Sequence, residues 1–381
     1  MLCIGVLYTG GTRIAEEWKL QFHGNLQKMT EKMYMTGLTY LDKEEKNARE
    51  TIVKCAFQLV PLGEYIDEKV VYAAELEDEE TNAMILAMQE ADENEVDKRG
   101  KLVKEDENNE SVKKAAEEAK KSPKSTVDMS MDKLKNFDYL TSHFYTVDSS
   151  TFVKPEDLQA EKLLNANMKI DKTKKGPKIL LYHTHSQEAF KDSVPGDVNT
   201  TIVGMGRILA KLLNEKYGIE TLHHEGIYDM KDGRVDRSQA YERAKPAIQK
   251  ILKENPSIEM VIDLHRDGVR EDTHLVTNIN GKPTAKIMFF NGLSRTRTNG
   301  KVQVLENPYI QNNLALSLQM KLAAEKKYPG FTRNIYLKGY RYNMHFRPKN
   351  MLVEGGAQTN TVEEMKNAMV LLAELLNDVV G

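Results

Sequence analysis

Short apolar runs alternate with longer amphipathic stretches from about residue 175 to the C-terminus. The short runs predict buried strands, because they are apolar on both faces and too short for helices. The longer stretches place apolar residues three and four positions apart, which predicts helices. The predicted strands cover residues 178–182, 219–222, 260–265, 286–290 and 350–354, and the predicted helices cover 202–217, 238–254, 309–327 and 362–379. This alternation predicts an α/β fold with a mostly parallel sheet covered by helices on both faces.

Two residues punctuate the predicted helices. Gly218 follows the amphipathic stretch 202–217 and predicts its C-terminal end. Pro246 lies inside the stretch 238–254, where the missing backbone N–H predicts a break or a kink.

The first 135 residues have a different character from the rest. Residues 1–12 contain an apolar run that fits either a short core strand or the remnant of a membrane anchor or signal. Residues 13–90 have a mostly helical pattern. Residues 91–135 are highly charged and lack aromatic side chains, which predicts a linker, either unpacked or a solvated helix. The main domain is expected over residues 136–381.

Composition limits the classes of function. The chain has 381 residues, with 54 Lys and Arg against 57 Asp and Glu and a formal net charge of −3, which argues against a protein held mainly by nucleic-acid phosphates. The two cysteines, Cys3 and Cys55, cannot build a disulfide framework or a thiolate zinc cluster. Any metal must therefore be bound by histidine and carboxylate.

Three predicted strands end on residues that bind metals or transfer protons. The first strand leads to His183 and His185, the strand 260–265 ends at His265, and the strand 350–354 ends at Glu354. Because the carboxyl ends of parallel strands meet at one edge of a sheet, we expect these side chains to lie together.

This set of residues suits zinc-assisted hydrolysis. A catalytic zinc takes three protein ligands, typically two histidines and one carboxylate, and His185, Glu188 and His265 would supply them. Glu354, followed by two glycines that let a substrate approach, is the candidate general base.

Several alternatives stay open at this stage. His183 shares a strand face with His185 and would be the ligand itself, a residue that orients the ligand, or a core histidine. Glu188 would instead be an acid near a helix start. Asp263 would orient His265 or pair with Arg266. His223 and His224 are expected to be surface or turn residues, and His345 has no preferred role. Three further polar residues would be ligands for a substrate carboxylate or part of an exposed basic loop, namely Arg341, Asn343 and Arg347.

Separate stretches of the chain resemble a known family. In order, YHTHSQEAF, ENPSIEMVIDLHRDGV, ENPYIQNNLALSLQMK, YPGF, RYNMHFRP and MLVEGGAQTNTVEEM resemble stage II sporulation protein P. That family comprises zinc-dependent cell-wall hydrolases related to N-acetylmuramoyl-L-alanine amidases, and the similarity covers about residues 138–381.

The resemblance implies an activity and a location. It implies cleavage of the amide between N-acetylmuramic acid and the L-alanine of the peptidoglycan stem peptide, with endopeptidase activity on cross-links as a further expectation. It also implies membrane anchoring, action between mother cell and forespore during engulfment, and stage II sporulation proteins D and M as partners. No nucleic-acid partner is expected.

The resemblance also implies roles for single residues in a zinc amidase-like catalytic domain. Its two histidine ligands fall on His185 and His265, and its late catalytic glutamate falls on Glu354. The broader amidase family has its carboxylate ligand at the start of the helix after the first strand, where this chain has no glutamate. Glu188 takes that role as the nearest acid in the motif, and Asp197 is the next candidate.

Two rival classes compete with this hypothesis. An amidohydrolase-type barrel also carries His–x–His on its first strand, but the strands and helices after residue 175 are few for eight βα units. A metal-free module would instead grip glycan or peptide through basic and aromatic residues, namely Arg341, Arg347, Tyr336, Tyr340 and Tyr342. Metal content separates the hydrolase from the binding module.

Overall fold

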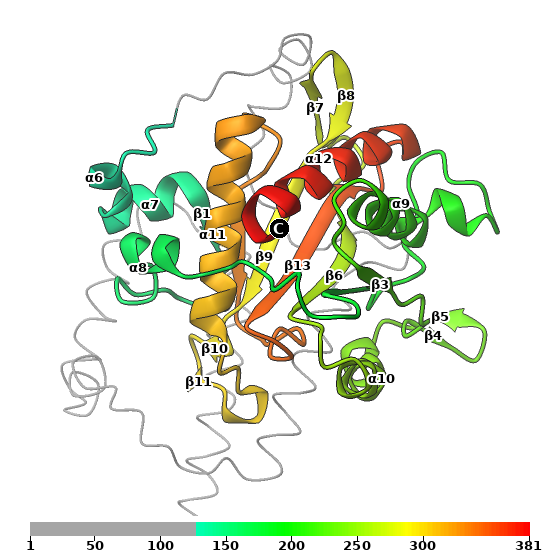
Figure 1. Cartoon of the computed structure of the whole chain (residues 1–381), viewed down its shortest axis with the longest axis horizontal. Coiled ribbons are helices and arrows are strands. Elements are labelled where there is room, and N and C mark those ends of the chain that lie inside the picture. The colour runs from blue at the N-terminus through cyan, green and yellow to red at the C-terminus, as the bar shows by residue number, and fades with distance from the viewer. Residues whose placement is uncertain (1–126) are drawn as a thin grey trace, which may run out of the picture. The chain divides into compact units, whose positions relative to one another are not determined.

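A seven-stranded sheet forms the centre of the part of the chain that the structure, a computed structural model, describes, residues 127–381 (Figure 1). Its strand order is β1-β12-β9-β13-β6-β2-β3. The strands are β1 (Tyr145–Val147), β12 (Ile335–Lys338), β9 (Ile287–Gly292), β13 (Lys349–Ala357), β6 (Met260–Asp267), β2 (Ile179–Tyr182) and β3 (Thr221–His223).

The sheet consists of two parallel blocks. Strands β1, β12 and β9 run in one direction, and β13, β6, β2 and β3 are parallel to each other. The blocks meet at one antiparallel pair, β13 and β9. The predicted mostly parallel sheet is therefore confirmed, and the carboxyl ends of β13, β6 and β2 lie side by side at one edge.

Helices cover both faces of the sheet, as predicted (Figure 1). On one face, α9 (Ile202–Glu215), α11 (Ile310–Lys327) and α12 (Val362–Val380) share a core with residues such as Leu181 and Ile262. On the other face, α10 (Ala240–Glu254) packs over Leu180, Tyr182 and Val261. Successive side chains of β2 point to opposite faces of the sheet, and helices cover both faces. Every position of the strand is therefore buried, which explains its unbroken apolar run.

The smaller elements lie outside the sequence predictions. Three short helices, α6 (Met131–Leu134), α7 (Phe137–Phe144) and α8 (Ala160–Asn165), come before strand β2 in the chain. Three two-stranded ribbons are formed by β4 (Met230–Lys231) with β5 (Arg234–Val235), β7 (Val276–Ile279) with β8 (Lys282–Ala285), and β10 (Arg295–Thr296) with β11 (Gly300–Lys301). None of the helices within residues 127–381 is long and apolar enough to cross a membrane.

Helix α10 differs from its prediction at Pro246. The helix continues from Ala240 to Glu254 through this proline, so of the predicted break or kink the break is wrong. Its buried residues, including Ala244 and Ile248, pack on the sheet on both sides of the proline in sequence. Packing of this face offsets the loss of one backbone hydrogen bond.

Residues 127–135, which the sequence analysis placed at the end of the linker, pack against the domain. Leu134 in α6 is only 2% exposed and belongs to the main core. The folded unit therefore includes residues before the predicted start at 136. The predictions for residues 1–12, 13–90 and 91–126 lie outside the described residues.

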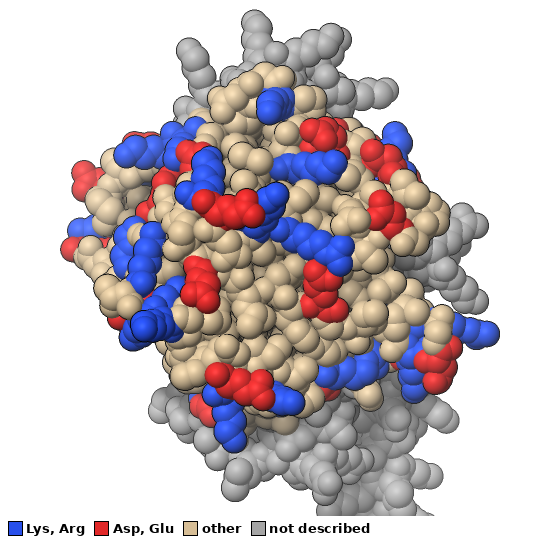
Figure 2. All heavy atoms as spheres, turned by 45° about the vertical axis from the view of Figure 1, so that its right-hand side comes forward, with Lys and Arg blue, Asp and Glu red and all other residues tan. Residues whose placement is uncertain are grey.

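The surface carries charges of both signs. Figure 2 shows basic and acidic side chains interspersed over the face it presents. This distribution agrees with the small formal net charge of −3.

Candidate active site

The carboxyl ends of β2, β6 and β13 bring the predicted site residues to one place. Glu354 in β13 is the register partner of His265 in β6. His185, just beyond the end of β2, has its ring centroid 5.1 Å from that of His265. The convergence predicted from the strand ends is therefore confirmed, although these contacts do not test the roles assigned to the residues.

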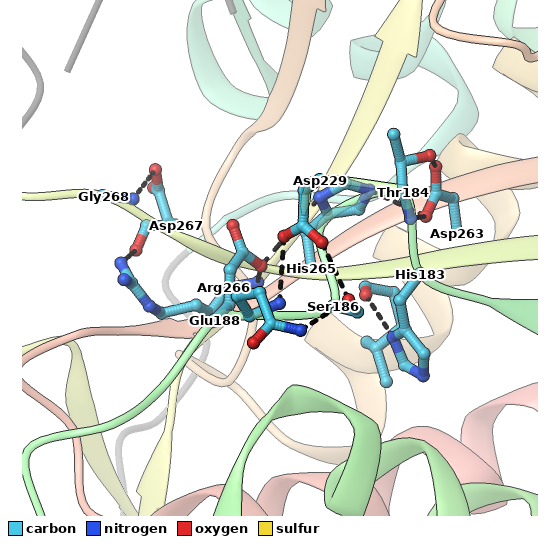
Figure 3. Close-up of polar contacts among 12 residues, drawn as sticks. His183, Thr184, Ser186, Glu188, Asp229, Asp263, His265, Arg266, Asp267 and Gly268 are labelled. Atoms are coloured by element: carbon cyan, nitrogen blue, oxygen red, sulfur yellow. Dashed lines mark hydrogen bonds and ion pairs between the residues drawn. The ribbon is translucent and has the colours of Figure 1, made fainter. Parts of the chain in front are cut away.

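Glu188 lies in the loop after β2 and points toward β6 (Figure 3). Its Oε2 accepts a hydrogen bond of 2.8 Å from the backbone N–H of Arg266 and lies 4.0 Å from Nδ1 of His265. Its Oε1 lies 3.5 Å from Nη2 of Arg237. Because helix α9 begins only at Ile202, Glu188 is not an acid at a helix start.

His265 and Asp263 form a buried charged pair on β6. Nε2 of His265 lies 2.7 Å from Oδ1 of Asp263, whose two oxygens also accept hydrogen bonds from the backbone N–H and hydroxyl of Thr184. Burial alone would lower the pKa of His265, but Asp263 and the nearby Glu188 and Glu354 raise it to about 10. Asp263 thus contacts His265, which favours the orienting role over pairing with Arg266.

His185 is buried and neutral. Burial and the nearby His265 and arginines hold the pKa of His185 well below its ordinary value. Its Nδ1 is buried and has no hydrogen-bond partner among residues 127–381. A neutral imidazole with an unpartnered nitrogen has the chemistry of a metal ligand.

His183 is engaged elsewhere, inside the protein. Its Nδ1 donates to the carbonyl oxygen of Leu264 at 2.7 Å, and its Nε2 lies 2.8 Å from Nε2 of His223. Burial, with a smaller contribution from the neighbouring His223, lowers the pKa of His183 to about 3. Both nitrogens have partners, so His183 fits the orienting or core role left open by the sequence better than the ligand role.

His223 and His224 differ from the expected surface positions. The side chain of His223 is only 9% exposed and contacts His183 and, through Nδ1 at 3.5 Å, Glu225. Nε2 of His224 lies 2.6 Å from the hydroxyl of Tyr228. Both histidines are partly buried because β3 pairs with β2 and brings them against the interior.

Glu354 presents a carboxylate oxygen that nothing satisfies. Its Oε2 is buried without a hydrogen-bond partner in the described part of the chain. Burial raises the pKa of Glu354 to about 8; His265 opposes this rise, and Asp267, Glu188 and Asp263 add to it. A carboxyl group with a pKa near the working pH can both accept and return a proton.

The residues fit zinc by their chemistry. Within residues 127–381, no group of three or more His, Cys, Asp or Glu side chains is already arranged to hold a metal ion. His265 nevertheless lies close to both other candidates, with its ring centroid 5.1 Å from that of His185 and its Nδ1 4.0 Å from Oε2 of Glu188, and Nδ1 of His185 is an orphaned buried atom. This donor set is the one that catalytic zinc prefers.

The other predicted residues serve internal contacts. Asn343 donates from Nδ2 to the carbonyl oxygen of Tyr241 at 2.8 Å, and Arg341 donates to the carbonyl oxygen of Glu306 at 3.3 Å. Arg341 is 7% exposed and Asn343 is 3% exposed. Their binding of substrate stays a prediction.

Two further candidates have clear local roles. The guanidinium group of Arg347 donates to the carbonyl oxygens of Leu252, Ile258 and Phe346, so it ties the end of α10 to the loop before β6. The carboxylate of Asp197 accepts from the backbone and side chain of Asn199 in a turn before α9.

Three residues near the site were not predicted. The buried carboxylate of Asp229 accepts hydrogen bonds from the hydroxyl of Ser186 at 2.8 Å and the backbone N–H of Gln187 at 3.0 Å (Figure 3). Arg237 contacts Glu188, and Tyr241 packs against both histidines. Asp229 and Arg237 lie in the connection between β3 and α10, where irregular backbone gives no periodic signal, and Tyr241 lies in the first turn of α10, where the helical pattern does not show which neighbours it contacts.

Comparisons with known proteins agree on a family. A family model described as stage II sporulation protein P matches residues 50–377. Stage II sporulation protein P of Bacillus subtilis (strain 168) is 22% identical over 215 residues, which make up 52% of this chain and 50% of that protein. The chain thus spans about half the length of the curated relative it matches.

Solved structures with similarity are N-acetylmuramoyl-L-alanine amidases. One from Nostoc punctiforme is 14% identical, with a TM-score of 0.31, and the match covers 54% of this chain and 97% of that chain. One from Clostridium difficile 630 is 12% identical, with a TM-score of 0.30, and the match covers 55% of this chain and 100% of that chain.

Proposed function

The chain belongs to the stage II sporulation protein P family, and from this premise we propose that it is a zinc-dependent peptidoglycan hydrolase of sporulation and engulfment. The bond cleaved is the amide between N-acetylmuramic acid and the L-alanine of the stem peptide, with cross-link endopeptidase activity as an addition. The observation that carries the proposal is the meeting of His185, Glu188 and His265 with the unsatisfied carboxyl group of Glu354.

His185, Glu188 and His265 would hold the metal. When bound, zinc would supply a Lewis acid that acidifies water and polarises the scissile carbonyl group. Asp263 holds the ring of His265 from its other nitrogen, and the backbone N–H of Arg266 holds one oxygen of Glu188. These contacts orient the ligands before the substrate arrives.

Glu354 would transfer the proton. As a carboxylate it would take a proton from the attacking water, and it would then deliver that proton to the amide nitrogen that leaves as an amine. Its unpartnered Oε2 supports this role, because a carboxylate fully bonded to the protein would be a weaker base. Arg341 and Asn343, which are two positions apart in the segment before β13, would bind a carboxylate or amide of the stem peptide.

The setting of the enzyme follows from the same premise. The protein would be anchored in the membrane and act outside the cytoplasm, between mother cell and forespore. Stage II sporulation proteins D and M would be its partners there.

Zinc content and release of stem peptides from purified sacculi test the proposal together. Wild-type protein should bind about one zinc ion per chain and release stem peptides. His265→Ala should lose both metal and activity, whereas Glu354→Gln should keep the metal and lose turnover. His143→Ala and Glu363→Gln serve as matched controls. Both residues are exposed and lie outside the set of site residues, so both variants should behave as wild type. Wild-type protein that binds sacculi without zinc would instead support the metal-free binding module.

A further inference from the structure

The first turn of α10 and the residues just before it contact all three predicted metal ligands. The ring of Tyr241 packs edge-on against His185, with centroids 5.9 Å apart, and lies stacked on His265 at 6.4 Å with planes 14° apart. Four residues earlier, Arg237 contacts Glu188. Tyr241 is 4% exposed, so its ring fills the space between α10 and the two histidines.

Unusual backbone conformations gather around Tyr241. Gln239, two residues before it, has a φ of 56° at the N-cap of α10. Tyr342 and Asn343 are consecutive left-handed residues with φ of 50° and 53°. The ring of Tyr342 packs on Tyr241 at 5.5 Å, and Asn343 bonds its carbonyl oxygen. Three of the six non-glycine residues with positive φ in the described part therefore act on one tyrosine.

Such conformations are costly for residues with side chains. A left-handed tyrosine or glutamine persists only where the surrounding structure holds it, and such residues cluster at functional sites. Helix α10 would begin without strain if Gln239 were extended, as helix N-caps usually are. The left-handed residue instead lies in the turn between Arg237 and Tyr241, and both of these side chains, four positions apart, contact the site.

We propose that Tyr241 is a positioning residue that holds the rings of His185 and His265 in the mutual arrangement required for metal binding. Gln239 aims Tyr241 at the histidines, and Tyr342 and Asn343 support it from behind. The ring does not bind the metal or the substrate in this role. The inference rests on the proposed zinc-dependent function and adds a residue that determines how well the site is organised.

Substitutions at Tyr241 separate positioning from general packing. Tyr241→Leu keeps an apolar side chain but removes both ring contacts, whereas Tyr241→Phe keeps the ring. Val302→Ala is the matched control, because Val302 is buried in the same apolar cluster but is not one of the residues through which the proposal acts. The measurements are the zinc dissociation constant, by competition with a chromophoric chelator, and the thermal midpoint of the metal-free protein.

Tyr241→Leu should weaken zinc binding by about 10- to 100-fold, as loss of a supporting contact at a metal site does. Tyr241→Phe should bind zinc as wild type does. Val302→Ala should lower the thermal midpoint while its zinc affinity stays at the wild-type value. Equal zinc affinity of Tyr241→Leu and wild type would overturn the positioning role.

A backbone test at Gln239 covers the case in which Tyr241→Leu does not fold. The side chain of Gln239 is exposed, so substitutions there change mainly the backbone preference. Glycine adopts positive φ readily and a β-branched residue does not. Gln239→Val should therefore bind zinc more weakly than Gln239→Gly, and equal affinities would overturn the proposal.

The wild-type protein distinguishes the two levels of failure. If wild-type protein binds no zinc, both the proposed function and the positioning role fail. If wild-type protein binds zinc and releases stem peptides while every Tyr241 and Gln239 variant binds zinc equally well, only the positioning role fails.

Discussion

At the scale of single residues, the contact between Asp263 and His265 predicts how the imidazole is oriented. The carboxylate of Asp263 lies between Nε2 of His265 and the two donors of Thr184, and Asp263 is 1% exposed. Asp263→Asn keeps the size of the side chain but removes the charge that holds the imidazole. We expect zinc affinity to fall by about 10- to 100-fold. Equilibrium zinc titration of metal-stripped protein checks this, with Thr184→Ser, which retains the hydroxyl donor, as a control near wild type. Unchanged affinity in Asp263→Asn would contradict the orienting role.

His345 predicts a pH dependence of stability that does not involve the metal site. Burial, together with Arg341 and Lys245, lowers the pKa of His345 to about 3. Because the unfolded chain takes up this proton near pH 6.5, folding stability is lost as the pH falls from about 6.5 toward 3. Urea unfolding at pH 7 and pH 4.5 should show a smaller acid-induced loss for His345→Gln than for wild type. His143→Gln, at an exposed position, is the control and should keep the wild-type difference. An acid-induced loss in His345→Gln equal to that of wild type would count against the prediction.

The site residues at strand ends, and Glu188 shortly after the first of them, could be identified from the sequence, whereas those that reach the site from more distant segments could not. His185, His265 and Glu354 each follow or end an apolar run, so periodicity and the rule for parallel strands place them together. Asp229 reaches the site from an irregular connection and Tyr241 from the first turn of α10, and their contacts with the site depend on tertiary packing that no local pattern encodes. The role of His183 also required the structure, because its partner Leu264 belongs to another strand.

At the scale of elements, the hydrophobic pattern closely predicted five of the sheet strands and the four long helices, namely β2, β3, β6, β9 and β13 and α9, α10, α11 and α12. The edge strand β1, strand β12 and the two-stranded ribbons were missed because they are short and only partly apolar. The antiparallel pairing of β13 with β9 was also missed, since strand direction in a sheet is set by how the connections pack. This pairing matters for function, because it separates the site edge from the carboxyl ends of β1, β12 and β9.

Helix α9 packs so closely on the interior that one of its glycines is required. A Cβ at Gly206 would lie 2.6 Å from Nε2 of both His183 and His223. Glycine inside a helix usually costs stability relative to alanine, so Gly→Ala at an open helix position is normally stabilising. We expect Gly206→Ala instead to destabilise the protein by about 1–3 kcal/mol, because it overpacks the histidine pair. Urea unfolding measures this, with Lys211→Ala on the exposed side of the same helix as the control. A gain in stability for Gly206→Ala would show that the histidine pair moves freely.

At the scale of the whole molecule, the sequence predicted that the folded domain begins at residue 136. A charged segment of mixed sign gave no sign that its last residues are packed, because a few buried apolar side chains are hidden among polar neighbours. The structure places Leu134 in the same core as the sheet and α11, although it stands before the predicted boundary at 136. Helix α6 is therefore part of the domain that carries the site.

Leu134 provides the test of that boundary in the full chain. Leu134→Ala removes a side chain that is 2% exposed and should lower the free energy of unfolding by about 2–5 kcal/mol. Met131→Ala in the same helix is the matched control, because Met131 is 39% exposed and should cost much less. Zinc affinity should stay unchanged in both variants. Helix α6 packs against α7 and α8, so it supports the fold and does not contact the ligands His185 and His265. If Leu134→Ala were as stable as Met131→Ala, residues before 136 would contribute nothing to the core, and the boundary predicted from charge alone would be the better one.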